Sequence, residues 1–282
     1  MVIQSVERAA LILRALGSGA PRLGVTEIAE RVGLAKPTVH GLLRTLAACE
    51  LVVQDADTGK YALGPAVLQL GNAYLDGSEL RARSLLWAGS LAERVNEAVW
   101  VGTLSGSRVI VLHHVFRPDD VVQILEVGAA IPWHACALGH AIVAHDPRRE
   151  ELLAGELVPL TGLTRTSRPD LERALAAVRE DGYAIEDQEA ALGDAGIAAP
   201  VFGRDGSVAG AVGAIGPAER LLDRERREDV ARAVRETARA VSRDLGAPRS
   251  AGHRDPAAFS APMMSADDAA PGSSWPTLRG PR

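Results

Sequence analysis

Within residues 25–44, apolar residues recur at the spacing of an α-helix in two short neighbouring segments. Gly33 separates the two segments and can take the positive φ that a tight turn between helices often requires. Lys36 and Pro37 open the second segment, where proline is tolerated because the first backbone donors of a helix have no intrahelical partner. The pattern predicts a helix-turn-helix. Its apolar positions are Ile28, Ala29 and Val32 in the first helix and Val39, Leu42 and Leu43 in the second.

The opposite side of the second predicted helix carries small and polar residues. Such side chains can reach base edges and phosphates, and this composition is typical of a helix that lies in the major groove of DNA. Lys36 and Lys60 are the only lysines of the chain, and Lys60 follows a turn that suits the wing of such a domain. The candidate DNA-binding residues are Lys36, Pro37, Thr38, His40, Gly41, Arg44, Thr45 and Lys60.

The flanking patterns complete a small domain around the helix-turn-helix. An apolar stripe predicts a first helix with Ser5 as its N-cap and an end before Gly17. Two short apolar strands, 51–53 and 61–63, flank a turn that contains Asp and Gly, which predicts a β-hairpin. Three helices followed by a hairpin indicate a winged-helix DNA-binding domain, which we expect over residues 1–64.

Residues 65–96 contain two further segments with helical spacing, the second of them preceded by Ser78 as a candidate N-cap. These helices connect the DNA-binding head to a second body. Two interpretations stay open for them: linker helices that also form a dimer interface, or a plain interdomain linker.

From Val99 onward the apolar period changes to that of β-strands. The predicted strands are 98–103, 108–115, 121–127, 183–186, 195–202 and 207–215. The predicted helices are 137–145, 170–181 with Asp170 as its cap and Gly182 as its end, and 219–245. This order predicts an α+β body with an antiparallel sheet over residues 97–246. Residues 247–282 contain six prolines and no periodicity, the composition of a disordered tail.

Length and composition agree with two domains in a reducing compartment. The chain has 282 residues, of which 47% are hydrophobic and 4% aromatic. No apolar run approaches the roughly 20 residues of a membrane span, and the first residues do not resemble a signal peptide. Cys49 and Cys136 are the only cysteines, too few for a disulfide scaffold. We therefore expect a cytoplasmic protein without membrane association.

The formal net charge of −5 argues against a protein that binds nucleic acid non-specifically through its overall charge. Residues 1–60 contain seven Lys or Arg and six Asp or Glu, a difference of +1. Affinity for DNA must therefore come from the positions of the cations rather than from bulk charge.

Six of the seven histidines lie in the predicted folded part, so a metal site has to be considered. None of them forms a spacing typical of zinc ligands, and His134 and His140 are separated by a predicted junction between loop and helix. Cys136 beside His134 suggests a nucleophile, although a small buried cysteine is the more common state. We expect no metal and no cofactor. A metal-dependent hydrolase that uses the histidines is retained as the alternative function.

Two segments rich in small residues are candidate binding segments. Residues 128–140 lead into a helix whose N-terminal backbone donors favour an anion, and residues 210–217 allow a ligand to approach the backbone. Tight core packing explains both segments equally well. Glu186, Asp187 and Glu189 line the same pocket or form a solvated acidic loop.

Several motifs occur in an order that resembles the IclR family of bacterial transcriptional regulators over about residues 3–246. The motifs are Ser5-Val6-Glu7-Arg8-Ala9, Tyr61-Ala62-Leu63-Gly64, Leu68-Gln69-Leu70-Gly71, Pro132-Trp133-His134-Ala135-Cys136-Ala137-Leu138-Gly139, Gly196-Ile197-Ala198-Ala199-Pro200-Val201 and Gly216-Pro217. The resemblance implies a winged-helix head, a dimerising linker helix and a GAF-like effector-binding domain. It also implies homodimers or homotetramers on double-stranded operator DNA.

Positions carried over from the family imply an effector site formed by His134, Ala137, Leu138, Glu186, Gly196, Gly213 and Ile215. Cys136 and His140 replace the more common Ser or Thr and Lys of the family, which predicts a less polar floor than in relatives that bind keto acids. Residues 113–120 and 240–247 are most similar to family members that regulate glycerol use. This similarity implies glycerol or glycerol 3-phosphate as effector, with His134 and His140 neutralising the phosphate. The predicted function is a DNA-binding repressor under control of this effector, and not an enzyme.

Overall fold

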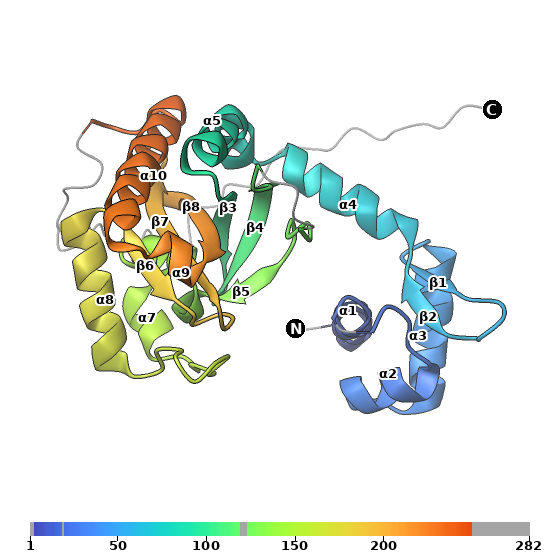
Figure 1. Ribbon diagram of the computed structural model, residues 1–282. Helices are drawn as coiled ribbons and strands as arrows, with labels where there is room; N and C mark the ends of the chain where they lie inside the picture. Colours follow the sequence, from blue (N-terminus) through green and yellow to red (C-terminus); the bar gives the residue numbers. More distant parts are fainter. Residues whose placement is uncertain (1–2, 19, 119–122, 250–282) are drawn as a thin grey trace, which may run out of the picture.

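The N-terminal part of the chain forms a winged-helix head. The computed structural model of the protein describes residues 3–18, 20–118 and 123–249 (Figure 1). The elements of the head are α1 (Gln4–Leu16), α2 (Val25–Val32), α3 (Lys36–Ala48), β1 (Val52–Gln54) and β2 (Tyr61–Leu63). The hairpin is antiparallel, with Val52 opposite Leu63. The predicted winged helix is therefore present.

One core holds the head together. Ile12 of α1, Ile28 of α2 and Leu43 of α3 are fully buried, and Tyr61 of the hairpin joins them. Gly33 has φ of 66°, so the turn between α2 and α3 has the left-handed conformation that glycine adopts without steric cost. The predicted cap of α1 is wrong. The helix begins at Gln4 after Ile3, so Ser5 already lies in the first turn and cannot act as the N-cap.

Two helices connect the head to the C-terminal domain. They are α4 (Pro65–Asp76) and α5 (Glu79–Val95), and Ser78 caps α5 because its Oγ accepts a hydrogen bond of 3.2 Å from the Arg81 N–H. No residue of α4 is buried, whereas α5 packs Leu91 and Ala92 into the core of the C-terminal domain. Figure 1 shows α4 extending between the head and this domain.

The C-terminal domain is built on one antiparallel sheet with the strand order β5-β4-β3-β8-β7-β6. Its helices cover both faces. The elements are β3 (Ala98–Ser105), β4 (Arg108–Val115), β5 (Ala130–Pro132), η1 (Trp133–Ala135), α6 (Ala137–Val143), α7 (Arg149–Leu153), α8 (Arg168–Asp181), β6 (Ala184–Asp187), β7 (Asp194–Phe202), β8 (Val208–Pro217), α9 (Ala218–Leu221) and α10 (Arg224–Asp244).

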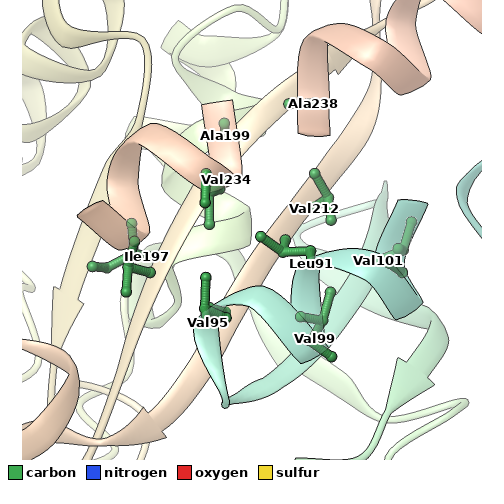
Figure 2. Packing of buried hydrophobic residues seen from close by; sticks show 14 of the residues in the cluster. Leu91, Val95, Val99, Val101, Ile197, Ala199, Val212, Val234 and Ala238 are labelled. Atoms are coloured by element: carbon green, nitrogen blue, oxygen red, sulfur yellow. The ribbon is translucent and has the colours of Figure 1, made fainter. Parts of the chain in front are cut away.

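Alternation along the central strands separates two hydrophobic cores. Val212 of β8 and Ala199 of β7 face the core beneath α5 and α10 (Figure 2). Ala211 and Ala198, one residue away on the same strands, face the core beneath α6 and α8. Because successive side chains of a strand point to opposite faces, small and β-branched residues in the central strands allow helices to pack on both. The predicted α+β body is confirmed.

Three predicted elements of this domain need correction. Residues 123–127 of the predicted strand 121–127 are not extended into the sheet, and the short β5 pairs with β4 instead; residues 121 and 122 lie outside the described residues. The predicted helix 219–245 is two helices, because Asp223 caps α10 by accepting from the backbone N–H groups of residues 225 and 226. The cap of α8 is Ser167 rather than Asp170, so α8 begins two residues earlier.

The predicted tail lies almost entirely in residues 250–282, outside the described part of the chain. In the described ranges, no helix combines the length and the apolar character needed to cross a lipid bilayer.

Candidate nucleic-acid interface and ligand site

One side of α3 is open to solvent. Val39, Leu43 and Leu46 anchor α3 in the core of the head, and the opposite side carries the predicted contact residues. Of the candidates, Thr38 is half-buried, and the exposed ones are Lys36, Pro37, His40, Gly41, Arg44, Thr45 and Lys60. Nothing lies within 4 Å of a Cβ built on Gly41, so the helix surface is open at this position. The sequence therefore places a solvent-facing polar helix surface next to the wing.

The wing is fixed by hydrogen bonds within its own turn. Asp55 Oδ1 accepts from the backbone N–H and the hydroxyl of Thr58, and the Asp55 backbone N–H donates to the Lys60 carbonyl at 2.8 Å. These bonds with Thr58, together with the nearby Arg22, lower the pKa of the Asp55 carboxyl. The Lys60 Nζ lies 3.8 Å from Glu27 Oε2, a loose and exposed ion pair that leaves the ammonium group accessible.

A second group of predicted site residues, which includes two histidines, lies where η1 is followed by α6. A Cβ on Gly139 would come within 2.0 Å of the Trp133 carbonyl oxygen, so glycine is required for the loop to pack this closely on the helix. His140 Nε2 donates to the His134 carbonyl at 2.8 Å, and His134 Nε2 lies 3.0 Å from the Val158 carbonyl. Both imidazoles are buried and hold backbone segments in place.

His140 cannot supply a positive charge at neutral pH. Burial is the main cause that lowers the pKa of His140 to about 4, and the nearby Arg165 guanidinium acts in the same direction. His140 Nδ1 is buried without a hydrogen-bond partner among the described residues. The predicted role of His134 and His140 in neutralising a phosphate is therefore not supported by their geometry.

Ala137, Glu186 and Gly196 meet at the start of α6. A Cβ on Gly196 would lie 3.1 Å from Ala137 Cβ and 3.4 Å from Glu186 Oε2. Glu186 is only 6% exposed, and its Oε1 accepts from the backbone N–H groups of Glu189 and Ala190. Burial raises the pKa of Glu186 to about 7, so its carboxyl is partly protonated at neutral pH.

Glu189 is a second buried carboxyl near this cluster. Its Oε2 accepts from the Arg165 backbone N–H at 3.0 Å, and its Oε1 lies 3.4 Å from the Arg165 guanidinium. Burial outweighs these contacts and raises the pKa of the Glu189 carboxyl. Glu186 and Glu189 are thus buried, whereas Asp187 on the same segment is exposed.

Sheet register places the remaining predicted ligand residues. Ile215 lies opposite Gly196, which lies opposite Glu186, so the three share one row across β8, β7 and β6. Gly213 lies in the next row, between Ala198 and Trp100. Leu138 is buried in the core beneath α6, as is Ala137. The structure thus brings together Ala137, Glu186, Gly196 and Ile215, with Gly213 beside them. Leu138 is buried next to Ala137, and the His134 ring contacts the Val158 carbonyl.

Sequence reasoning missed two polar groups in the row of Gly213. Trp100 lies opposite Gly213 and His114 lies opposite Trp100, with 5.8 Å between the centroids of their rings. Trp100 Nε1 and His114 Nε2 are buried without a partner among the described residues. A tryptophan on a predicted strand was the available signal, because a buried indole N–H needs a hydrogen-bond partner.

The catalytic alternative finds no support in these residues. Cys136 is fully buried, and burial raises the pKa of its thiol to about 12, so the thiolate that a nucleophile needs is not formed. Within the described ranges, no group of three or more His, Cys, Asp and Glu side chains is arranged to hold a metal ion.

Comparison with known proteins defines the class to which this winged-helix and α+β architecture belongs. The chain belongs to the IclR family of bacterial transcriptional regulators. Residues 5–56 match the IclR helix-turn-helix domain, and residues 72–243 match the C-terminal domain of bacterial transcriptional regulator IclR.

Two curated relatives are similar over nearly their whole length. The chain is 48% identical over 249 residues to the glycerol operon regulatory protein of Streptomyces griseus, covering 88% of this chain and 98% of that one. It is 47% identical, with the same coverage, to the glycerol operon regulatory protein of Streptomyces coelicolor. These relatives and the family are regulators rather than enzymes, so the hydrolase alternative is set aside.

Solved structures agree with this assignment. An IclR transcriptional regulator from Alicyclobacillus acidocaldarius has a TM-score of 0.76 and 29% identity, with 87% of this chain and all of that chain covered. An IclR homolog from Microbacterium hydrocarbonoxydans, solved with 4-hydroxybenzoate, has a TM-score of 0.71 and 25% identity, with coverages of 86% and 98%.

Proposed function

We propose that this regulator represses a glycerol-utilisation operon and that a small polyol of the glycerol class is its effector. The exposed polar side of α3 carries the DNA-binding part of the proposal, because its side chains are free to contact base edges. The names of the two Streptomyces relatives support the operon. A family member from Salmonella typhi, 30% identical, is named a transcriptional repressor, which supports the sign of regulation.

The chemistry of the ligand site favours hydroxyl groups over a phosphate. Glu186 and Glu189 place two carboxyls at the site, and the nearby Arg165 is already paired with Glu189. Carboxylate oxygens accept hydrogen bonds from hydroxyls, whereas a phosphate dianion would be repelled by them. Trp100 Nε1 is a buried donor that a ligand oxygen can satisfy. Of the two candidate effectors, glycerol therefore fits this site better than glycerol 3-phosphate.

The connecting helices supply a surface for a second copy of the chain. Large apolar side chains are exposed along α4 and α5, including Leu68, Leu70, Tyr74 and Leu86. An apolar patch of this kind indicates an interaction site. The net charge of the first 60 residues is only +1, so a single head has little electrostatic attraction to DNA. A dimer or tetramer with paired heads would bind operator DNA more tightly.

Effector binding can change the affinity for operator DNA only if the effector binds one arrangement of the paired heads more tightly than another. A tenfold to hundredfold change in operator affinity requires a coupling free energy of about 1–3 kcal/mol. The linker helix α5 packs against the sheet that carries the ligand site, through Leu91 and Val95 (Figure 2). A shift of this sheet on ligand binding would therefore move the helices that carry the heads.

The DNA-binding part is tested with Arg44→Ala and the matched control Arg14→Ala, which removes an exposed arginine from α1. We expect Arg44→Ala to lower the ratio of operator affinity to random-DNA affinity by about tenfold to a hundredfold, because base contacts specify sequence. Lys36→Ala should weaken binding to both DNAs and reduce the salt dependence. Fluorescence anisotropy with labelled duplexes measures both. An unchanged ratio in Arg44→Ala would contradict the proposed reading surface.

A further inference from the structure

A cavity of about 540 Å³ lies at the end of the C-terminal domain away from Glu186. It lies between the C-terminal ends of α8 and α10, beside the second half of β7. Five arginines line it, and no acidic side chain does so within the described residues. The arginines are Arg179 of α8, Arg235, Arg239 and Arg243 of α10, and Arg249.

Two of these guanidinium groups are held in place by neutral partners. Arg179 donates to the Ala144 carbonyl at 3.3 Å, and Arg235 donates to the Asp181 carbonyl at 3.0 Å. Arg235 also lies over the Tyr183 ring, with 5.3 Å from its Cζ to the ring centroid. Carbonyls and aromatic rings orient a guanidinium but do not cancel its charge. Among the described residues neither guanidinium forms an ion pair, and Glu236, whose own ion pair is with Arg94, acts on Arg235 only through space.

The spacing on α10 concentrates this charge. Arg235, Arg239 and Arg243 follow one another at intervals of four residues, so they lie on one side of the helix. Like charges at this spacing destabilise a helix, and the acidic neighbours are engaged elsewhere: Glu236 pairs with Arg94, and Asp244 accepts from Trp87. Basic residues near a helix C-terminus complement its dipole, which accounts for Arg243 but not for Arg235 two turns earlier.

The edge of β7 at the cavity has few backbone N–H groups that could donate hydrogen bonds to a ligand. Beyond Ala198, the last β7 residue paired with β6, no strand of the described sheet pairs with the outer edge of β7. Pro200 has no N–H, and the Phe202 N–H donates to Ser242 Oγ at 3.0 Å. His145, which lines the same cavity, has its pKa lowered to about 4 by burial and by Arg179, so it is neutral. The arginines thus supply the charge that a ligand would meet.

We propose that this cavity is a second ligand site, which binds a small phosphorylated metabolite. Several guanidinium forks around one cavity match a tetrahedral dianion, because each fork can contact two phosphate oxygens, whereas a monocarboxylate would compensate only one charge. The site is separate from the polyol site proposed above. Helix α6 begins at Ala137 beside Glu186 and ends at Val143, two residues before His145 at this cavity, so the two sites lie near opposite ends of this helix.

The test uses the full-length chain and calorimetric titration with inorganic phosphate, glycerol 3-phosphate and glycerol at 0.15 M salt, about physiological. The variant Arg239→Gln/Arg243→Gln removes two exposed cavity arginines. The matched control Arg224→Gln/Arg232→Gln removes two exposed arginines of the same helix that do not line the cavity. We expect both phosphate-bearing probes to bind the native chain and the control, and to bind the cavity variant at least about tenfold more weakly.

Glycerol binding should be equal in all three proteins, which separates this site from the polyol site. Failure of glycerol to bind would count against the proposed effector and leave the cavity proposal intact. Equal phosphate binding by the native chain and the cavity variant would overturn the cavity proposal. An equal loss in the cavity variant and the control would also overturn it, because the effect would then come from the net charge of α10.

Discussion

At the scale of single residues, Glu186 is the group whose chemistry depends most on the fold. Its carboxyl is buried beside Gly196, and burial raises its pKa to about 7. A hydroxyl ligand can donate to the ionised carboxylate, or accept from the protonated acid. The ionisation of this one side chain therefore links the stability of the domain to pH.

We expect Glu186→Gln to stabilise the protein at pH 8 and to leave it unchanged near pH 4.5. The folded-state pKa of Glu186 is raised, so the native acid form contributes stability that is fully present at low pH and lost as pH rises through about 7. The gain at pH 8 is at most about 3 kcal/mol, from 1.36 kcal/mol per pKa unit. Urea unfolding at both pH values measures it, with Glu180→Gln as the exposed control.

Cys136 gives a second prediction at this scale. Cys49 is exposed and Cys136 is buried with a thiol pKa of about 12, so only Cys49 should react with a thiol reagent in the native state. Titration with Ellman's reagent at pH 8 should count one thiol per chain before unfolding and two in denaturant. Two rapidly reacting thiols in the native protein would show that the loop before α6 is open.

At the scale of elements, patterns that depend on neighbours in sequence were predicted well. The strand over residues 108–115, the cap at Ser78 and the end of α8 at Gly182 all follow from local periodicity and turn chemistry. The strand expected over 121–127 was wrong where it is described, because apolar alternation alone does not show whether a partner strand is available.

The ligand site, too, depends on tertiary contacts that local sequence patterns do not predict. Glu186 and Gly196 could be named from the family resemblance, but their contact with Ala137 depends on the packing of α6 on the sheet. Trp100 and His114 join the neighbouring row only through the register of β3 with β4 and β8, which no local pattern specifies. All seven residues of α6 are buried, so helix periodicity alone does not show whether Ala137 or Leu138 would face a ligand.

The connecting helices carry a prediction of their own. Leu86 is 85% exposed on α5, and we expect Leu86→Asp to dissociate dimers, because it places a charge in the proposed apolar interface. The control Ile124→Asp changes a residue that is 77% exposed and lies outside these helices. Analytical ultracentrifugation should show a lower molar mass for Leu86→Asp only, with unchanged circular dichroism. A native protein that is already monomeric would refute the proposed interface.

At the scale of the whole molecule, the fold joins a helix-turn-helix head, two connecting helices and a C-terminal domain in one chain, and we propose that the connecting helices form a dimer interface. The helix-turn-helix exposes a polar face with weak overall charge, so we expect a single head to bind DNA with low affinity. Pairing of two heads through α4 and α5 would add the missing affinity. In this proposal, the ligand site would regulate DNA binding by changing the arrangement of the two paired heads.

The central claim is that a small polyol at the Glu186 site releases this regulator from its operator. The most direct measurement is anisotropy of a labelled duplex from the region upstream of its own gene, titrated with the protein in the presence of glycerol or pyruvate. We predict that glycerol weakens operator binding tenfold to hundredfold, that pyruvate does not, and that Glu186→Ala abolishes the response. Operator affinity that is unchanged by glycerol, or equally reduced in Glu186→Ala, would contradict the account.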